Sequence, residues 1–370
     1  MPPMRIAFLT WRDTTHPDGG GSEVYVEEVA RRLATRGHDV TIVCARHGQA
    51  ATDELVSGVR LRRVGGRLTV YPRALAWLVR HRVDVVVDVI NGLPFGTPLV
   101  RRRGVVALVH HLHQRQWQII YPGLAGRLGW WVESRLTPRL YRGLPHLTVS
   151  EASRRDLTGL GVEDVTIARN GLASPGAQRA RSATPRLCVL ARLVPHKRIE
   201  HAIAVAASLQ REFPDLHLDV IGDGWWREEL EKEVARLDAA DIVTFHGHVD
   251  EPSRDRLLAQ AWLMLLPSVK EGWGLAVMEA AAQATPTIAY REAGGVTESV
   301  VDDETGRLVD DLAGLEGATR DLLRNPWTRQ RLGERARERA LTFDWESTTD
   351  VVETVLLAAR APQHRQTRSP

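Results

Sequence analysis

The sequence predicts an α/β protein of two domains, each built on an open parallel sheet with helices on both faces. Three observations predict this fold class. The chain has 370 residues, which is more than one hydrophobic core usually serves. Short continuous apolar runs alternate with longer segments of helical periodicity. The alternation then restarts after a stretch rich in Ala, Ser, Arg and Pro at residues 173–186, which we interpret as a linker.

The first half of the chain supplies continuous apolar runs, as expected for strands buried on both faces of a parallel sheet. These strand candidates are Arg5–Thr10, Val40–Cys44, Val59–Val64, Asp84–Ile90, Val105–Val109 and His146–Val149, and the run Val165–Ala168 follows them before the linker. The clearest helix is Ser22–Arg36, whose apolar residues recur at helical spacing. Ser22 is its expected cap, and Gly37 supplies the stop.

The second half repeats the pattern with its own strands and helices. Its strand candidates are Leu187–Ala191, Leu216–Ile221, Ile242–Phe245, Trp262–Leu266 and Thr287–Ala289. Its predicted helices are Arg198–Glu212, Trp226–Leu237, Arg254–Ala261 and Ala276–Gln283, and a last helix, about Ser347–Ala359, lies beyond the needs of the second sheet. Residues 361–370 are expected to form a disordered tail. Because ligands of open α/β sheets bind beyond the carboxyl ends of the strands, we expect the chemistry in loops that follow strands, where two sheets face across a cleft.

Composition excludes several classes of protein. Apolar residues make up 43% and charged residues 26% of the chain, the balance of a globular protein and not of a disordered or collagen-like one. No uncharged apolar run reaches the length of about eighteen residues that crosses a membrane, and Arg5–Thr10 is too short for a signal peptide. We therefore expect a cytoplasmic protein in which Cys44 and Cys188 are buried free thiols.

Charge is unevenly distributed between the two halves. Residues 1–180 hold 25 arginines against 15 acidic residues, a net charge of +10, whereas residues 181–370 hold 24 basic against 31 acidic residues, a net charge of −7. A basic half is expected when that half faces something anionic, although arginines that simply cover surface would give the same imbalance. We expect no nucleic-acid partner.

Three glycines, Gly19, Gly20 and Gly21, separate the first strand from the first helix. Glycine lets a ligand approach the backbone, and a helix N-terminus favours an anionic group; a plain turn that caps the helix is the alternative. A dinucleotide site is not predicted, because G-x-G-x-x-G is absent and Cys44-Ala45-Arg46, with no acidic residue, ends the second strand. The pattern therefore argues against a dehydrogenase.

Three histidines, His110, His111 and His113, follow the strand Val105–Val109. Successive side chains of an extended segment point to opposite sides, and no Cys or Asp cluster lies at metal-ligand spacing, so a metal site is not predicted. A histidine that hydrogen-bonds a ligand at the strand end and a purely structural histidine both remain open.

Two cations, Arg192 and Lys197, follow the strand Leu187–Ala191. A loop at this place can direct both at one diphosphate, the arginine as a fork and the lysine as a point charge. Lys197 is one of three lysines in the chain. Positive charge at a helix start is unfavourable against the helix dipole, which indicates a compensating anion over two merely solvated cations.

The most informative segment runs from Pro267 to Glu279. Glu271 precedes the helix Ala276–Gln283 and Glu279 lies in its second turn, which separates the carboxylates by on the order of 10 Å at the helical rise. Between them, Gly272 and Gly274 expose backbone N–H groups at a helix N-terminus, which suits a phosphate. A ligand with hydroxyls at both ends and phosphates in the middle matches this layout, which is that of a nucleotide sugar.

These residues resemble a known family. Glu271-Gly-Trp-Gly…Glu279 is similar to the E-x7-E element of the retaining glycosyltransferases of family 4 (glycosyl transferases group 1), which have the GT-B fold of two Rossmann-like domains. The resemblance extends over nearly the whole chain through Gly19–Glu23, Val149–Glu151, Arg169–Gly171, Arg192 with Lys197, Gly222–Gly224, Thr305–Val309 and Phe343–Trp345. It departs from the family at Trp273, where Phe is commoner, at Ala284, where Gly is common, and at Arg169, where Pro is usual.

The resemblance implies a domain division and residue roles. Residues 1–172 would bind the acceptor, 173–186 would link the domains, 187–345 would bind the nucleotide sugar, and the helix at 346–360 would cross back to the first domain. Glu271 would bind donor-sugar hydroxyls, Glu279 the ribose, and Arg192 and Lys197 the diphosphate. The backbones of Gly272, Trp273, Gly274 and Leu275 would lie close to sugar and phosphate, with Gly20 and Gly21 also at the donor. His110 matches the family's histidine near the transferred sugar, with His111 as the ambiguity.

The expected reaction moves a hexosyl unit from a nucleoside diphosphate to an acceptor hydroxyl with retention of configuration. No D-x-D tripeptide occurs, consistent with cations in place of a metal at the leaving group, so no cofactor is expected. The alternatives are a nucleotide-sugar epimerase or hydrolase of the same fold, and a non-catalytic nucleotide-sugar-binding module.

The acceptor is less defined: a glycan, a lipid-linked acceptor or a small-molecule glycoside all fit. Large apolar residues between Trp117 and Trp131 lie among arginines between Arg115 and Arg142. They are open to two interpretations. One is a core-packing helix with solvated arginines, kinked near Pro138; the other is a segment that rests on an anionic membrane surface at the inner face.

Overall fold

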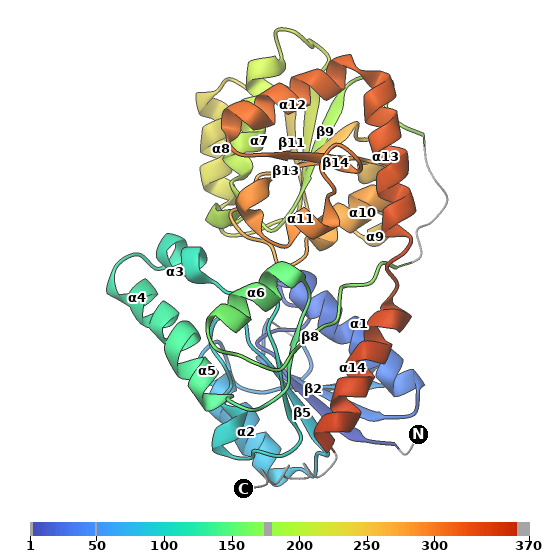
Figure 1. Ribbon diagram of the computed structural model, residues 1–370. Helices are drawn as coiled ribbons and strands as arrows, with labels where there is room; N and C mark the ends of the chain where they lie inside the picture. Colours follow the sequence, from blue (N-terminus) through green and yellow to red (C-terminus); the bar gives the residue numbers. More distant parts are fainter. Residues whose placement is uncertain (1–2, 49, 174–179, 361–370) are drawn as a thin grey trace, which may run out of the picture. The chain divides into compact units, whose positions relative to one another are not determined.

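The computed structural model describes residues 3–48, 50–173 and 180–360. It divides into two compact units. Unit 1 comprises Met1–Gln114, Gly123–Arg169 and Trp345–Pro370, and unit 2 comprises Arg115–Pro122 and Asn170–Asp344 (Figure 1). Residues 174–179 of the predicted linker and the predicted tail at 361–370 lie outside the described residues.

Unit 1 is built on an eight-stranded sheet of order β3-β4-β2-β1-β5-β6-β7-β8. Its strands are β1 (Arg5–Leu9), β2 (Asp39–Cys44), β3 (Asp53–Val56), β4 (Val59–Arg63), β5 (Val85–Val89), β6 (Val105–Leu108), β7 (His146–Thr148) and β8 (Val165–Ile167). Every predicted strand of this half is present, and most of these strands are buried apolar runs, whereas β4 carries three arginines and β8 is only partly buried. All pairs are parallel except β3 with β4.

Strand β3 is not among the predicted strands, and its four residues are all exposed. This edge strand forms a hairpin with β4 through Ser57 and Gly58, which have φ angles of 50° and 82°. Two consecutive positive φ angles are the geometry of the tight hairpin turn that joins antiparallel strands. An exposed edge strand has no apolar run to reveal it.

Helices cover both faces of the unit 1 sheet. They are α1 (Gly21–Thr35), α2 (Val70–Arg80), α4 (Leu124–Trp131), a π-helical turn (Val132–Leu136), α5 (Thr137–Leu140), α6 (Glu151–Gly159) and α14 (Trp345–Arg360), with a 3-10 turn at Thr97–Leu99. Apolar residues of α2, α5 and α6 join one core cluster with the strands, while α1 and α14 lie together on the other face (Figure 1).

The last helix belongs to unit 1, as the family resemblance predicts. Arg36, at the end of α1, pairs with Glu346, Asp350 and Glu353 of α14, and His38 bonds Glu353 at 2.9 Å. These contacts join residues more than 300 positions apart in the sequence. The C-terminal helix therefore returns to the first sheet.

Unit 2 is built on a six-stranded, wholly parallel sheet of order β11-β10-β9-β12-β13-β14. Its strands are β9 (Arg186–Leu190), β10 (His217–Ile221), β11 (Val243–Gly247), β12 (Leu263–Leu266), β13 (Thr287–Tyr290) and β14 (Gly306–Val309). Its helices are α3 (Gln114–Ile120, all but its first residue), α7 (Ile199–Leu209), α8 (Arg227–Arg236), α9 (Glu251–Gln260), α10 (Leu275–Ala282), α11 (Val296–Ser299), α12 (Leu312–Arg324) and α13 (Pro326–Ala340), with 3-10 turns at Pro195–Lys197 and Arg291–Ala293. The structure thus confirms the two open α/β sheets.

Both cysteines are free and buried, as predicted. Burial raises the pKa of the Cys44 thiol, with Asp13 contributing, and burial likewise raises the pKa of the Cys188 thiol. Among the helices of the described residues, none combines the length and the apolar character that a bilayer crossing requires.

Candidate functional site

The loop after β9 carries the first two predicted residues of unit 2. Arg192 lies partly buried between β9 and the 3-10 turn, and Lys197 is the last residue of that turn. The Lys197 ammonium donates to Glu271 Oε1 at 2.5 Å, and only 15% and 13% of the two side chains are exposed. The fold thus brings together two predicted site residues that lie 74 positions apart.

Two glycines hold the Arg192 loop in place. A Cβ at Gly222 would lie 2.0 Å from the carbonyl oxygen of Ala191, and one at Gly224 would lie 2.4 Å from that of Leu193. The Leu193 N–H donates to the Asp223 carbonyl at 3.0 Å. The glycines quoted from the family motif are therefore required by backbone contact at this loop.

Glu271 lies in the loop after β12, which is bonded to its two neighbouring loops through the backbone. The Glu271 N–H donates to the Ala293 carbonyl at 2.8 Å, and the Gly295 N–H donates to the Glu271 carbonyl at 3.1 Å. The Val269 N–H donates to the His196 carbonyl at 2.9 Å. Because β9, β12 and β13 are adjacent strands, their following loops meet at one edge of the sheet and form a single connected surface.

The helix α10 begins directly beside Glu271. Gly274 caps it with a φ of 91°, and its carbonyl accepts from the Val277 N–H at 2.9 Å. The Trp273 indole is buried edge-on against Phe343, with ring centroids 5.1 Å apart. Trp273 therefore contributes its backbone to this segment, and the N–H groups of the first turn provide an anion-binding helix end.

Glu279 lies in the second turn of α10 and pairs with Arg254 of α9, Nη1 to Oε1 at 2.8 Å. Burial raises the pKa of Glu279 to about 7, although the Arg254 guanidinium acts in the opposite direction. Arg254 is not among the predicted site residues, and α9 begins three residues before the predicted helix. An arginine in the first turn of a helix opposes the helix dipole, and that signal, which we used for Lys197, also indicates Arg254.

In unit 1, the predicted glycine loop leads into α1, but its cap differs from the prediction. Gly20 and not Ser22 is the N-cap, and the Gly20 N–H donates to Glu23 Oε2 at 2.8 Å. Glu23 is buried and pairs with the buried Arg12, Nη2 to Oε1 at 3.3 Å. The Glu23 side chain reaches back and accepts a hydrogen bond from the N–H of the cap residue. Ser22 already lies inside the helix and is therefore not the cap. Both Glu23 and Arg12 were missed as site residues.

His110 is buried at the end of β6, with its ring edge-on to Tyr25 at 5.1 Å. Burial lowers the pKa of His110 to about 4, although Glu23 opposes this shift, so the imidazole is neutral at pH 7. Within the part of the chain that the structure describes, its buried Nε2 has no hydrogen-bond partner. A buried polar atom of this kind is costly unless a ligand satisfies it, which makes His110 a candidate ligand contact.

The other two histidines interact differently. The rings of His111 and His113 lie 4.5 Å apart, and His113 Nδ1 is 2.9 Å from Glu133 Oε1. His110 is the buried member of the three, whereas His111 and His113 are both half-buried. No group of three or more His, Cys, Asp or Glu side chains suited to a metal ion occurs in residues 3–48, 50–173 and 180–360.

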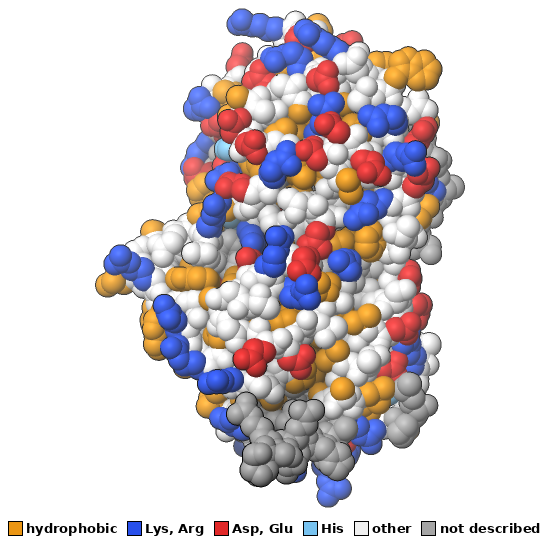
Figure 2. Space-filling view, viewed as in Figure 1, with side chains coloured by type: hydrophobic (Ala, Val, Ile, Leu, Met, Phe, Trp, Pro, Cys, Tyr) orange, Lys and Arg blue, Asp and Glu red, His pale blue; other side chains and the backbone are white. Residues whose placement is uncertain are grey.

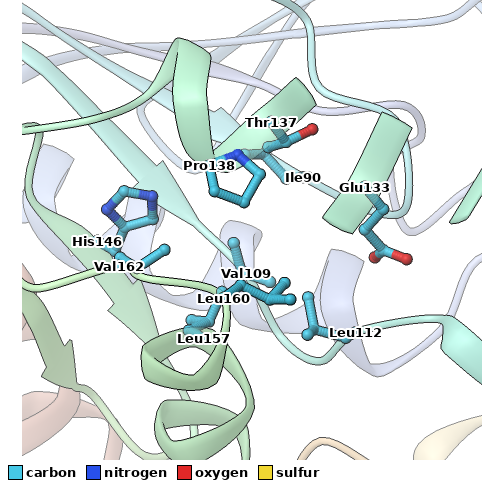
Figure 3. A pocket seen from close by; sticks show the side chains of 10 residues that line it. All are labelled: Ile90, Val109, Leu112, Glu133, Thr137, Pro138, His146, Leu157, Leu160 and Val162. Atoms are coloured by element: carbon cyan, nitrogen blue, oxygen red, sulfur yellow. The ribbon is translucent and has the colours of Figure 1, made fainter. Parts of the chain in front are cut away.

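Unit 1 also contains a small cavity beneath α5 and α6 (Figure 3). Its volume of about 10 Å³ holds one water molecule at most. Its lining is mainly apolar, with Glu133, Thr137 and His146 as the polar members. The cavity is too small for a sugar or a nucleotide, so it is not a substrate site.

Family comparisons cover nearly the whole chain. Residues 174–339 match the family described as "Glycosyl transferases group 1", and residues 19–174 match "Glycosyltransferase Family 4". The chain is 30% identical to an MMP alpha-(1->4)-mannosyltransferase of Mycolicibacterium hassiacum, over 93% of this chain and 95% of that protein.

Solved structures of low sequence identity share the fold. Sucrose-phosphate synthase from Thermosynechococcus elongatus superposes with a TM-score of 0.83 at 21% identity, over 96% of this chain and 99% of that one. Anabaena Alr3699/HepE, in complex with UDP-glucose, superposes with a TM-score of 0.76 at 17% identity, over 95% and 99%. Since the sequence relationship spans both sheets and the fold agrees, the chain belongs to the group 1 glycosyltransferases and is a glycosyltransferase of the GT-B fold.

Proposed function

We propose that this glycosyltransferase moves a hexosyl unit from a nucleoside-diphosphate sugar to an acceptor hydroxyl, with retention of anomeric configuration and without a metal cofactor. The HepE structure is a complex with UDP-glucose, and the Mycolicibacterium relative is named as a mannosyltransferase with an alpha linkage. Both support a nucleotide-sugar donor and a hexosyl group for this chain. Family membership favours transfer over the epimerase, the hydrolase and the non-catalytic binding module.

The observation that carries the proposal is the contact between Lys197 and Glu271 beside the first turn of α10. One loop offers an ammonium group, the next a carboxylate, and the helix end a set of backbone N–H groups. An ammonium and a helix N-terminus together suit a diphosphate, while a carboxylate suits sugar hydroxyls. In the proposal, the donor takes Lys197 as a phosphate partner and Glu271 as a hydroxyl acceptor.

Charge stabilisation is the proposed main source of catalysis. When the bond from the anomeric carbon to the β-phosphate oxygen breaks, negative charge develops on that phosphate. This charge would be stabilised by Lys197, by Arg192 and by the N–H groups that follow Gly274. Little reorganisation would be needed, because backbone hydrogen bonds already join the loops after β9, β12 and β13. The acceptor oxygen forms its bond on the same face, and its proton passes to the departing phosphate oxygen.

Two further residues have proposed binding roles. Glu279 would accept hydrogen bonds from the ribose hydroxyls, with Arg254 holding its carboxylate. His110 would bond the transferred sugar through Nε2, with the ring fixed as neutral by burial. Arg254 and Glu23 are positioning residues in this proposal. Arg254 acts through Glu279, and Glu23 acts through the backbone of Gly20.

A two-stage experiment tests the proposal. Thermal unfolding is first followed with a panel of nucleoside diphosphates and their sugars, because a ligand at a hundred times its Kd adds roughly 2.7 kcal/mol to stability. The best donor is then incubated with candidate hydroxyl acceptors, and products are analysed by mass spectrometry and by the anomeric proton coupling in NMR. We expect an α-linked product from an α-linked donor; an inverted product, an epimerised donor or free sugar as the sole product would refute it.

A further inference from the structure

In the segment from α4 to α5, large apolar side chains face outward and small or polar ones face inward, which is the reverse of an ordinary surface helix. A helix that packs on a domain turns its apolar side inward and its polar side outward. Here the large residues Leu124, Leu128 and Trp131 are 81%, 62% and 53% exposed. They recur at i, i+4 and i+7, so they form one outward stripe of α4.

The inward side of the same segment consists of small and polar residues. Gly126 and Gly129 are buried on α4, followed by Glu133, Ser134, Thr137 and Tyr141. Glu133 accepts from the His113 N–H at 3.0 Å, and the Tyr141 hydroxyl donates to the buried Asp88 and accepts from the Gly96 N–H at 3.0 Å. The segment is therefore anchored largely by hydrogen bonds, which leaves its large apolar side chains outside. The core-packing interpretation is wrong for these three residues, although Trp130 and Leu140 do pack against the core.

Four arginines of the same segment lie in and after the stripe along the chain. They are Arg127, Arg135, Arg139 and Arg142, all exposed. Arg139 donates to the Arg135 carbonyl at 2.6 Å, which places both on one side of the segment. In the described chain none of the four forms an ion pair with a carboxylate. Residues 89–150 contain eight arginines and a single acidic residue, Glu133, which is buried. Figure 2 shows orange and blue side chains alternating along the left flank of the molecule, over α4 and α5.

We propose that this stripe is a docking surface for an anionic lipid membrane, with Leu124, Leu128 and Trp131 entering the interface and the four arginines contacting lipid phosphates. The charge of the stripe selects the occupant: a cationic surface with apolar side chains matches anionic headgroups above acyl chains. A second copy of this cationic face would repel it. The surface lies wholly in unit 1, and its role does not depend on the proposed reaction.

Vesicle sedimentation tests the proposal on the full chain. Phosphatidylcholine vesicles that contain phosphatidylglycerol are compared with pure phosphatidylcholine vesicles, each at low and at high salt. We expect the protein to sediment with the anionic vesicles at low salt, at least about tenfold more strongly than with neutral ones, and to be released in part by salt.

Two variants separate the apolar and the electrostatic contributions. The first carries Leu124→Ser, Leu128→Ser and Trp131→Ser, and the second carries Arg127→Gln, Arg135→Gln, Arg139→Gln and Arg142→Gln. All these side chains are exposed, so both variants should fold with the wild-type Tm. Each should lower vesicle binding at least about tenfold.

Matched controls remove the same residue types from unit 2. The apolar control carries Leu312→Ser, Trp327→Ser and Leu341→Ser, and the charge control carries Arg211→Gln, Arg256→Gln, Arg331→Gln and Arg335→Gln, all at exposed positions. Both controls should bind vesicles like the wild type. Wild-type protein that ignores anionic vesicles, an apolar variant that binds as well as its control, or a dimer that the α4 substitutions dissociate would each overturn the proposal.

Discussion

The two units differ in their candidate ligand contacts: unit 2 offers pairs of acidic and basic side chains, and unit 1 offers a neutral side chain. In unit 2, basic and acidic side chains meet in close pairs: Lys197 with Glu271 and Arg254 with Glu279. In unit 1, the candidate contact is His110, whose imidazole is kept neutral by burial. Charged groups are thus paired within the fold, while the neutral group keeps one nitrogen that no described residue satisfies.

The difference indicates how each site would meet a ligand. A paired charge in a partly buried site must exchange its partner when a phosphate or hydroxyl binds, so the pair holds the side chain in place until then. A buried neutral nitrogen needs no exchange and gains a hydrogen bond on binding. We therefore expect unit 2 to control charge stabilisation and its pH dependence, and unit 1 to give a smaller, pH-independent contribution.

The largest expected effect comes from Lys197→Ala. Loss of the ammonium removes stabilisation of charge on the leaving phosphate, and kcat should fall about 10²–10³-fold. Lys232→Ala is the control, because Lys232 is an exposed lysine that also pairs with a glutamate, Glu229. Steady-state kinetics of both variants check this, and turnover of Lys197→Ala at the wild-type rate would contradict the phosphate assignment.

Gly295→Ala tests whether the connected loops hold these charges in place. The new Cβ would lie 1.8 Å from the Gly272 carbonyl oxygen, so the free energy of unfolding should fall by about 3 kcal/mol, with loss of activity. Gly317→Ala is the matched control, because Gly317 lies inside α12 with no atom within 4 Å of the new Cβ. That variant should gain about 0.5–1 kcal/mol. Equal Tm values for the two variants would rule out the loop connection.

His110→Gln should lower kcat by about tenfold, since it alters one neutral hydrogen bond of about 1.4 kcal/mol. Nucleoside-diphosphate affinity should stay unchanged. Because the pKa of His110 is lowered to about 4, the ratio of wild-type to variant kcat should be constant from pH 6 to pH 9. A ratio that changes near pH 6.5 would show a titrating imidazole and contradict the neutral assignment.

The smallest effect is expected for Glu279→Gln, which should weaken nucleoside-diphosphate binding roughly fivefold at pH 8. Since burial raises the pKa of Glu279 to about 7, the ionised carboxylate that accepts ribose hydroxyls is lost as the pH falls towards 6. Wild-type affinity, measured by calorimetry, should therefore rise from pH 6 to pH 8 more steeply than that of the variant. Parallel pH profiles would exclude Glu279 from the nucleoside site.

The same pKa shift has a consequence for stability. The Glu279 carboxyl has a pKa of about 7 in the folded protein, against 4.5 for an unperturbed glutamate, so between these values the folded protein binds more protons than the unfolded chain. The free energy of unfolding should thus fall with rising pH over this window, relative to Glu279→Gln. Thermal unfolding of both proteins from pH 4.5 to pH 8 measures the difference.

Most of the parallel strands were predictable, because burial on both faces favours continuous apolar residues. Strand β3 was not, since its side chains are exposed, and β14 was not, because Arg307 interrupts its apolar pattern. Ala284, which departs from the family's common glycine, has a φ of 57°. This left-handed conformation explains why glycine suits the position, yet nothing in the local sequence predicts it.

The candidate site residues could be proposed from the sequence one by one, but their pairing could not. Helix-end charges and glycines made Lys197, Glu271 and Glu279 candidates, but the sequence did not show that Lys197 contacts Glu271 or that Arg254 contacts Glu279. Glu23 and Arg12 were missed because their importance comes from burial beside Gly20 and His110, which only the packed fold creates. Pairwise contacts between distant loops depend on strand order, which local patterns leave open.

The two buried thiols make this chain easy to label. Thiolate is the form that attacks a maleimide reagent, and both Cys44 and Cys188 combine burial with a raised pKa, which keeps them as unreactive thiols. A cysteine introduced at an exposed position such as Trp131 would therefore react alone, without prior removal of the native cysteines. A fluorophore attached there would report by its emission colour whether that position enters a lipid environment.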